Sequence, residues 1–495
     1  MDMEEDKILI GDVIYTKHSP IDCAEKGFEA NYAGFKPETK TLKKGAVQKK
    51  GYGKLPCDII FERDVAVKMR DGVTIYCDIF RPVTDNKVPA IVAWSPYGKN
   101  GSGNQTIDVF PGKLGIHADE LSGLAMFEAP DPGYWVSQGY AVCNVDIRGA
   151  FMSEGNTPYW GKQDGEDGYD FIEWVAEQPW CNGKVALSGN SWLAISQWHI
   201  AVEKPPHLAA IAPWESSLRM YQDDIVRGGV DSSAFCRYII KGLFGNGYVE
   251  NPPDMVVDHR LYDDYWNSKE PDISMIDIPI YQVASWSNQT HTNGTFAAWR
   301  ELRSENKWLR VHNEMEWVDY YKKQNVEDLR KFFDRYLKNV DNGWEKTPQI
   351  RMSVLDLGSN NDIVGRVEKS FPPEHARLTK LYLSDGGNLS LDPQRSEGEI
   401  DYQADKQGDA VVFEYQMDHD IEILGYPKLQ LWIETDAYDN ADIFAYVQKV
   451  LPNGKVAIHQ PIRPDRFPWK TLYKHLDMDA NKVPSRILRT FPTAS

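Results

Sequence analysis

Short, largely apolar runs alternate with stretches of helical apolar spacing between residues 90 and 312, and this alternation constrains the fold most. The runs lie at residues 90–94, 140–145, 184–187, 209–212, 278–284 and 308–311, with helical spacing at 164–177 and 192–202. A short apolar run is typical of a strand that is covered on both faces. Strand and helix in alternation predict an α/β fold whose parallel sheet has helices on both faces.

The preceding segment and one internal segment differ from this pattern. Residues 1–55 carry seven lysines between positions 36 and 54 and little apolar periodicity, so we expect an N-terminal arm that is a solvated strap rather than a basic binding patch. An α/β domain is expected at 56–345, opening with a β-hairpin at 59–81 that turns at Asp71-Gly72. Residues 215–275 are aromatic and acidic without strand runs, which predicts a helical cap inserted above the carboxyl ends of the strands.

The C-terminal part changes to alternating strand patterns. Turn signals at 385–387 and 453–454 separate these patterns, which predict an all-β sandwich at 346–495. Few strand signals follow Pro461, so we expect the sandwich to lack its last strands. Open sheet edges favour pairing with another subunit, and a homo-oligomer is therefore expected.

Charge and composition exclude several classes of protein. The 55 Lys and Arg against 73 Asp and Glu give a net charge of −18, which argues against binding to nucleic acid. No window approaches the roughly 18 consecutive apolar residues of a membrane span, and the acidic start lacks the features of a secretory signal, so a cytoplasmic location is expected. The six cysteines form no CxxC pair, and neither a nucleotide fingerprint nor metal-ligand spacing is present, so we expect no cofactor and no metal.

One sequence motif indicates a catalytic residue. The run at 185–187 leads into Gly189-Asn190-Ser191-Trp192 and then into a stretch of helical spacing. A serine on a sharp turn from strand to helix has an exposed hydroxyl, and the helix start offers amides to an oxyanion. Gly189 is expected because a side chain there would crowd the turn. We therefore predict Ser191 as a nucleophile.

Several further segments are informative together with the serine motif. They include Trp94-Ser95-Pro96-Tyr97-Gly98-Lys99, Asp146-Ile147-Arg148-Gly149, Gly189-Asn190-Ser191-Trp192-Leu193, Phe332-Phe333-Asp334-Arg335-Tyr336-Leu337-Lys338 and Leu424-Gly425-Tyr426-Pro427. In this order they resemble one known family, the cocaine-esterase and X-prolyl dipeptidyl-peptidase group of α/β-hydrolases. The resemblance implies an α/β-hydrolase fold with a helical cap and a C-terminal domain of jelly-roll type. It also implies that the Tyr97 hydroxyl and the Trp192 amide bind the oxyanion.

The chain departs from this family at two catalytic positions. The family's acid position carries Asn288, in Ser285-Trp286-Ser287-Asn288, and Glu316 is nearest to the family's histidine position. A serine hydroxyl without a base is a poor nucleophile, so another residue must activate it. His291 oriented by Glu316 is one candidate, and Asn288 could orient a histidine as an amide does in cysteine proteases. His312 with Glu316 or Glu314 is the other.

These residues predict a serine hydrolase that cleaves an ester or activated amide of a small apolar substrate through an acyl-enzyme on Ser191. Trp214, Tyr221 and Trp286 are predicted to line the substrate pocket. The adjacent acids at 223–224 and 263–264 are expected to form solvated surface. Two alternatives stay open: a non-hydrolytic enzyme (cyclisation, isomerisation or carbon–carbon cleavage) that uses His and Glu as acid and base, and a catalytically inactive binding protein.

Overall fold

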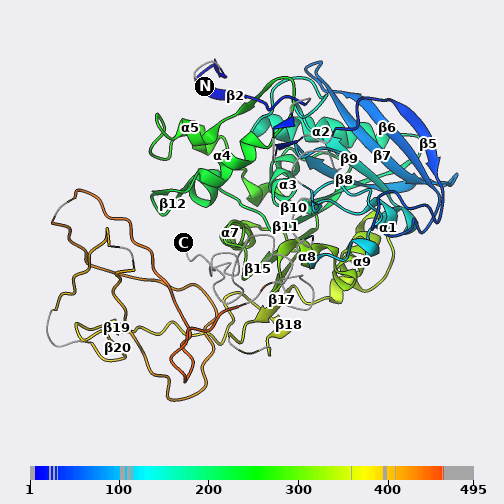
Figure 1. The fold of residues 1–495 in the computed structure, drawn as a ribbon. Helices are drawn as coiled ribbons and strands as arrows, with labels where there is room; N and C mark the ends of the chain where they lie inside the picture. Colours follow the sequence, from blue (N-terminus) through cyan, green and yellow to red (C-terminus); the bar gives the residue numbers. More distant parts are fainter. Residues whose placement is uncertain are drawn as a thin grey trace. The chain divides into compact units, whose positions relative to one another are not determined.

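A computed structural model of the protein contains an eleven-stranded sheet, the central sheet, with strand order β18-β17-β16-β15-β11-β10-β8-β9-β7-β6-β5 (Figure 1). The structure describes residues 6–21, 24–25, 28–29, 32–100, 106–108, 113, 115–357, 359, 361–393, 398–406, 408–436, 438–459 and 461. The strands are β5 (Glu38–Leu42), β6 (Ile59–Lys68), β7 (Thr74–Pro82), β8 (Val88–Ser95), β9 (Ala141–Asp146), β10 (Cys181–Asn190), β11 (Leu208–Trp214), β15 (Ile280–Ser285), β16 (Lys307–His312), β17 (Ile350–Val354) and β18 (Ile363–Glu368). Pairing is parallel from β9 through β8, β10, β11, β15 and β16 to β17, and antiparallel among β5, β6, β7 and β9.

Two hydrophobic cores lie on opposite faces of this sheet. Successive residues of a strand point to opposite faces, and in β9 Val142 joins one core while Cys143 joins the other. Helices α2 (Lys162–Glu177) and α3 (Trp192–Val202) pack on the first core. Helices α1 (Pro132–Ser137) and α9 (Lys323–Leu337) pack on the second. This double coverage explains the apolar runs and confirms the predicted α/β-hydrolase fold.

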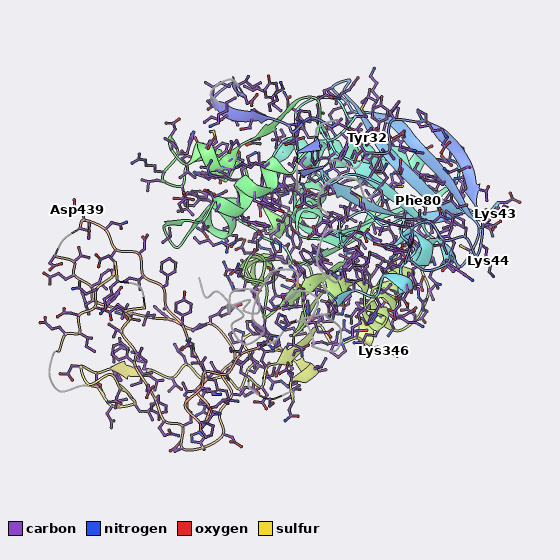
Figure 2. The ribbon with its side chains drawn as sticks, in the orientation of Figure 1. Tyr32, Lys43, Lys44, Phe80, Lys346 and Asp439 are labelled. Carbon is purple, nitrogen blue, oxygen red and sulfur yellow. The ribbon has the colours of Figure 1, made fainter. Side chains whose placement is uncertain are left out.

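The N-terminal arm is more than the expected strap. Its strands β1 (Lys7–Ile10) and β2 (Val13–Lys17) form a three-stranded sheet with β14 (Tyr248–Glu250) of the insertion, and β5 pairs with β6 at the edge of the central sheet. Figure 2 shows Lys43 and Lys44 just beyond β5 at this outer edge, and both contact Asp58. The lysines are solvated as expected, but the arm's backbone belongs to two sheets.

Residues 215–275, expected as a helical cap, fold into short elements. They are η3 (Met220–Ile225, a π-helix), β12 (Val226–Arg227), β13 (Val230–Asp231), α4 (Ala234–Lys241), β14, α5 (Pro252–Met255), α6 (Asp264–Asn267) and the 3₁₀ helix η4 (Ile273–Met275). We call this segment the insertion. Four further helices occur in the described part: α7 (Thr292–Glu301), α8 (Glu316–Tyr321) and the 3₁₀ helices η2 (Ala118–Glu120) and η5 (Trp344–Lys346).

The C-terminal part divides differently from the boundary expected at residue 346. One compact unit comprises residues 1–367 and 434–495, and the other comprises residues 368–433. Strand β17, expected to open the second domain, instead pairs in parallel with β16 and lies between β18 and β16 in the central sheet. The turn expected at 385–387 joins β19 (Tyr382–Leu383) to β20 (Leu389–Ser390), and the expected turn at 453–454 is present. The end of the expected sandwich, from residue 462, lies outside the described residues.

Candidate active site

Ser191 lies on the turn between β10 and α3, as predicted. Its φ of 56° and ψ of −122° place it in a sparsely populated region of backbone space. The Ser191 amide donates to the Glu215 carbonyl at 3.0 Å, and the Asn190 amide donates to the Glu128 carbonyl at 3.1 Å. Glu128 and Glu215 also have positive φ, at 64° and 56°. Three residues with positive φ therefore gather at this turn, with Glu215 bonded to Ser191 and Glu128 bonded to the adjacent Asn190, and such clustering is typical of functional sites.

Gly189 is required two residues before the serine. A Cβ at this position would lie 2.5 Å from Leu193 Cβ and 3.0 Å from the Glu128 carbonyl oxygen. The first contact is with the following helix, so a side chain would push α3 away from the turn. The steric reason expected for this glycine is confirmed.

Tyr97 and Trp192 lie beside the serine. The Tyr97 hydroxyl lies close to the Ser191 side chain, and burial raises the pKa of the Tyr97 phenol well above its usual range, so the phenol keeps its proton. The Tyr97 ring packs edge-on against Phe127 and Trp192. Trp192 is the first residue of α3, so its amide has no carbonyl four residues earlier within the helix. Both groups are thus available as oxyanion donors, and that role stays a prediction.

His291 reaches the nucleophile from the residue before α7. Its Nε2 lies 3.1 Å from Ser191 Oγ, within hydrogen-bonding distance. Its side chain is buried, and burial, with a smaller contribution from Arg227, lowers the pKa of His291 to about 3. The imidazole is therefore neutral at pH 7 and can accept a proton. Its Nδ1 faces Ser217 Oγ at 3.4 Å.

Glu316, the expected orienter of His291, is engaged elsewhere. Its Oε2 accepts a hydrogen bond from Asn288 Nδ2 at 2.6 Å. Asn288 Oδ1 accepts the backbone amides of Thr290 and His291, at 2.9 and 3.2 Å, so Nδ2 must point away from those amides. The correction to our expectation has a local cause: Asn288 binds the backbone of its own loop and Glu316. Within the described ranges, no hydrogen bond joins either side chain to the imidazole.

Glu128 belongs to the site, although it is not among the residues predicted from the sequence. Its side chain is buried, Oε1 accepts a hydrogen bond from Trp317 Nε1 at 2.8 Å, and Oε2 has no hydrogen-bond partner among the described residues. Burial raises the pKa values of Glu128 and Glu316, and the repulsion of Glu128 raises that of Glu316 further. One signal could have identified it, an acid in the otherwise apolar segment 125–130. The two carboxyls favour holding a proton near Tyr97.

His312, the second candidate base, binds Glu215, the residue whose carbonyl accepts the Ser191 amide. Its Nε2 lies 2.7 Å from Glu215 Oε1, and its Nδ1 accepts the Glu314 amide at 3.2 Å. The accepted amide leaves Nε2 as the protonated nitrogen that donates to Glu215. Glu215 in turn holds the Ser191 amide through its carbonyl. His312 is thus bound to Glu215 rather than to Glu316, and only its Nδ1 approaches the Glu314 backbone.

Alanine at His312 should therefore reduce stability. Both partners of the His312–Glu215 pair are buried, and removal of the imidazole leaves the buried Glu215 carboxylate with only the long 3.5 Å hydrogen bond from the Ser285 hydroxyl. We expect the free energy of unfolding to fall by about 3–5 kcal/mol, measured by urea denaturation. The exposed His117 provides the control, and His117→Ala should stay within about 0.5 kcal/mol of the wild type. A His312→Ala protein of unchanged stability would contradict this role.

The three residues predicted to line the substrate pocket lie in other surroundings. Trp214 is 1% exposed and packs against Tyr281 and Tyr320 in the second core, so the prediction for Trp214 is wrong: its position on β11 turns it into the core. The Tyr221 hydroxyl donates to the Arg260 carbonyl within the insertion. Trp286 Nε1 donates to the Ser353 carbonyl of β17. A substrate contact of Tyr221 or Trp286 stays a prediction.

The adjacent acids 223–224 are not the solvated surface that we expected. Asp223 and Asp224 are both buried. Asp223 Oδ2 accepts the amides of Leu218 and Arg219, at 2.9 Å each, and so closes a turn of the insertion. Asp224 Oδ1 accepts the Ser217 hydroxyl at 3.0 Å. The expectation was wrong because the insertion folds both acids inward beside α7. At 263–264, by contrast, both acids are exposed, and Asp263 caps α6.

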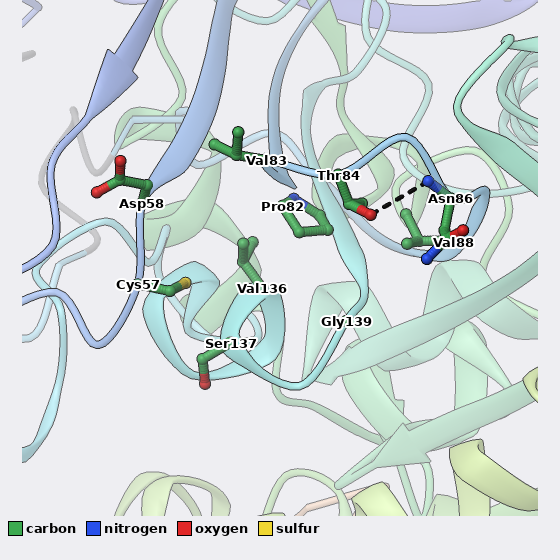
Figure 3. A pocket seen from close by; sticks show the side chains of 10 residues that line it. All are labelled: Cys57, Asp58, Pro82, Val83, Thr84, Asn86, Val88, Val136, Ser137 and Gly139. Carbon is green, nitrogen blue, oxygen red and sulfur yellow. Dashed lines mark hydrogen bonds between the residues drawn. The ribbon is translucent and has the colours of Figure 1, made fainter.

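Two hollows of the protein lie away from the serine. One, of about 400 Å³, lies between the end of β7 and the start of β8 (Figure 3). Ser191 follows the carboxyl end of β10, and the hollow lies at the amino end of β8. Because β8 and β10 are parallel, the hollow and the serine lie at opposite ends of the strands. The other, of about 520 Å³, is lined by residues including His117, Val318 and Tyr321. Neither lining includes Ser191. Among the described residues, no group of His, Cys, Asp and Glu could hold a metal ion, and no helix is long and apolar enough to cross a membrane.

Family models match two parts of the chain. Residues 71–253 match the X-Pro dipeptidyl-peptidase (S15 family) model. Residues 342–475 match the model of the X-Pro dipeptidyl-peptidase C-terminal non-catalytic domain. The first match contains Ser191 and Tyr97 and ends before Asn288, His291 and Glu316.

Known proteins and structures give the same picture. A CocE/NonD family hydrolase from Staphylococcus aureus is similar in structure, with a TM-score of 0.71, 34% identity, and coverage of 77% of this chain and 68% of the other. Cocaine esterase from Rhodococcus sp. (strain MB1 Bresler) is 36% identical over 192 residues, which are 39% of this chain and 30% of the esterase. An aminopeptidase from a Thaumarchaeota archaeon, 17% identical with a TM-score of 0.52 over 69% of this chain and 64% of the other, shares the fold.

Proposed function

Because the chain belongs to the CocE/NonD family of hydrolases, we propose that it is a serine hydrolase that forms an acyl-enzyme on Ser191 with His291 as general base. The observation that carries this proposal is the 3.1 Å contact between His291 Nε2 and Ser191 Oγ. The chain matches less than a third of the length of cocaine esterase, so the proposal depends on this site rather than on that enzyme's activity.

The reaction follows from the positions of these groups. Ser191 Oγ attacks the carbonyl carbon of an ester while its proton passes to His291 Nε2. The carbonyl oxygen becomes an oxyanion, which the Tyr97 hydroxyl and the Trp192 amide stabilise. The tetrahedral intermediate collapses as the C–O bond breaks, and His291 returns the proton to the leaving alcohol. Water then attacks the acyl carbon and gives a proton to His291. The bond between the acyl carbon and Ser191 Oγ breaks as His291 returns that proton to Oγ, which releases the acid product and restores the serine hydroxyl.

Aromatic side chains around the nucleophile support a small, apolar acyl group as the substrate class. Trp192 contacts the rings of Tyr97, Tyr159 and Trp160, with ring centroids 4.6 to 6.2 Å apart. Such surroundings favour an apolar group by excluding water and offer few polar partners for a charged one.

A fluorophosphonate probe tests this proposal directly. We expect the probe to phosphonylate Ser191 in the folded protein, located by peptide mass spectrometry, because an activated serine attacks phosphorus as it attacks a carbonyl. Ser191→Ala and the urea-unfolded wild type are the controls and should carry no label. Folded wild-type protein without label on Ser191 would contradict the proposal.

A second candidate function uses the same site without a covalent intermediate. The observation that favours it is the pair of neighbouring carboxyls, buried Glu128 and half-buried Glu316, whose pKa values are both raised, so that a carboxyl of the pair can hold a proton. An isomerase, cyclase or carbon–carbon lyase would need such an acid and base but not Ser191. A catalytically inactive binding protein, the third hypothesis, would turn over no substrate at all.

A further inference from the structure

His291 has a second contact that leads into the insertion. Its Nδ1 lies 3.4 Å from Ser217 Oγ, and the Ser217 hydroxyl donates to Asp224 Oδ1 at 3.0 Å. All three side chains are at most 4% exposed. Asp224 Oδ2 has no hydrogen-bond partner among the described residues. Burying a carboxyl group that accepts so few hydrogen bonds costs folding free energy, and such a group calls for a functional explanation.

The direction of these hydrogen bonds determines which nitrogen of His291 carries the proton. Ser217 has one hydroxyl proton and three potential acceptors, Asp224 Oδ1 at 3.0 Å, His291 Nδ1 at 3.4 Å and the Thr290 carbonyl at 3.5 Å. The shortest contact is to a carboxyl group, whose ionised form is the stronger acceptor. A Ser217 hydroxyl that donates to Asp224 can only accept from His291 Nδ1–H. His291 Nε2 then has the free lone pair that must face the proton of Ser191.

We propose that Ser217 and Asp224 are positioning residues that fix His291 in the tautomer of a general base, in place of the acid that Asn288 has replaced. This inference rests on the proposed function. Both residues come from the insertion, in or near η3, whereas Asn288 and Glu316 follow strands of the central sheet. The segment expected to cover the active site thus also completes it. The 3.4 Å contact is longer than an ordinary hydrogen bond and should shorten when His291 becomes positively charged.

The charge state of Asp224 links this arrangement to pH. Burial and then the neighbouring Asp223 raise the pKa of Asp224 to about 7, and Arg227 and Ser217 oppose this rise. The groups that face or surround this carboxyl are Asp223, Arg227, Cys236 of α4, Tyr159 and His291. Ionised Asp224 accepts the Ser217 proton, whereas protonated Asp224 no longer does so as strongly. Activity should therefore rise as pH increases through about 7 and be lost below it.

Asp224→Asn tests the arrangement with p-nitrophenyl acetate as probe substrate. The introduced amide can donate to Ser217, whose hydroxyl would then donate to His291 and stabilise the wrong tautomer. We expect kcat to fall by about 10²-fold or more, with KM within about threefold, and the rise of activity through pH 7 to disappear. Asp231→Asn, at an exposed carboxylate of the insertion, is the matched control and should leave kcat and the pH profile unchanged.

Variants of Ser217 provide an independent test if the Asp224→Asn protein does not fold. Ser217→Ala should lower kcat by a similar factor, whereas Ser217→Thr keeps the hydroxyl and should retain most activity. Combining Ser217→Ala with Asp224→Asn should cost no more than either change alone, because both act through His291. Additive losses, a pH profile unchanged by Asp224→Asn, or equal activities of the Ala and Thr variants would overturn the inference. Wild-type protein without esterase activity or label on Ser191 would instead contradict the proposed function.

Discussion

Alanine at Ser191 and alanine at His291 should each lower kcat for p-nitrophenyl acetate by on the order of 10⁴-fold, and the double variant should lower it no further. The two side chains act as one unit across their 3.1 Å contact, so the second change removes nothing that still functions. Initial rates of p-nitrophenol release measure the effect, and mass spectrometry after fluorophosphonate treatment reports the serine separately.

Two controls separate a lost base from a damaged fold. His117→Ala changes an exposed histidine, and Ser137→Ala changes a serine of α1 that donates to the Tyr134 carbonyl, so neither should alter kcat by more than about twofold. The result that contradicts the hydrolase mechanism is specific. If Ser191→Ala stays active and Glu316→Gln is silent, the carboxyl pair carries the chemistry, and the acid–base alternative is correct.

The central sheet could be predicted because strands covered on both faces need apolar residues at every position. Residues 90–94 meet this condition, residues 140–145 meet it except at Asn144, and the two runs mark β8 and β9. Strand β5, with the sequence Glu-Thr-Lys-Thr-Leu, has one neighbour and much exposed surface, so no local pattern marks it. Strand β17 alternates as a sandwich strand does, and only its partner β16 assigns it to the central sheet. A strand at or near the edge of a sheet is defined by partners that a local pattern does not contain.

The residues of the site also differ in whether the local sequence could predict them. Ser191 follows from four consecutive residues and their flanking elements, and its position on the turn is confirmed. Glu128, Ser217 and Asp224 approach the serine from segments 63, 26 and 33 positions away in the sequence, and their residue types resemble ordinary surface polar residues. Asp224 in particular has the sequence surroundings of a solvated acid, and only the fold of the insertion buries it. In an irregular segment the sequence shows no hydrophobic periodicity from which the burial of a single polar residue could be inferred.

Restoring the family's acid and histidine should return activity to a protein that lacks His291. By resemblance, the family has these two residues where this chain has Asn288 and Glu316, and here the two side chains meet at 2.6 Å. In a His291→Ala background, Asn288→Asp together with Glu316→His should raise kcat for p-nitrophenyl acetate by about 10²-fold over His291→Ala alone, because the introduced imidazole gains an adjacent carboxylate. Glu316→His without Asn288→Asp is the matched control and should give a smaller gain, since an amide cannot stabilise the imidazolium as a carboxylate does.

Asn288→Asp alone should give no gain in the otherwise unchanged protein. One carboxylate oxygen would receive the amides of Thr290 and His291, and the other would face the Glu316 carboxyl instead of an imidazole. Two adjacent carboxyls share a proton rather than both ionising, and the pKa of Glu316 is already raised by burial and by Glu128. A rise in kcat of tenfold or more from this single change would show that the new carboxylate reaches His291 directly. In that case the Ser217–Asp224 contact would be dispensable, and the missing acid at position 288 would be what limits the serine.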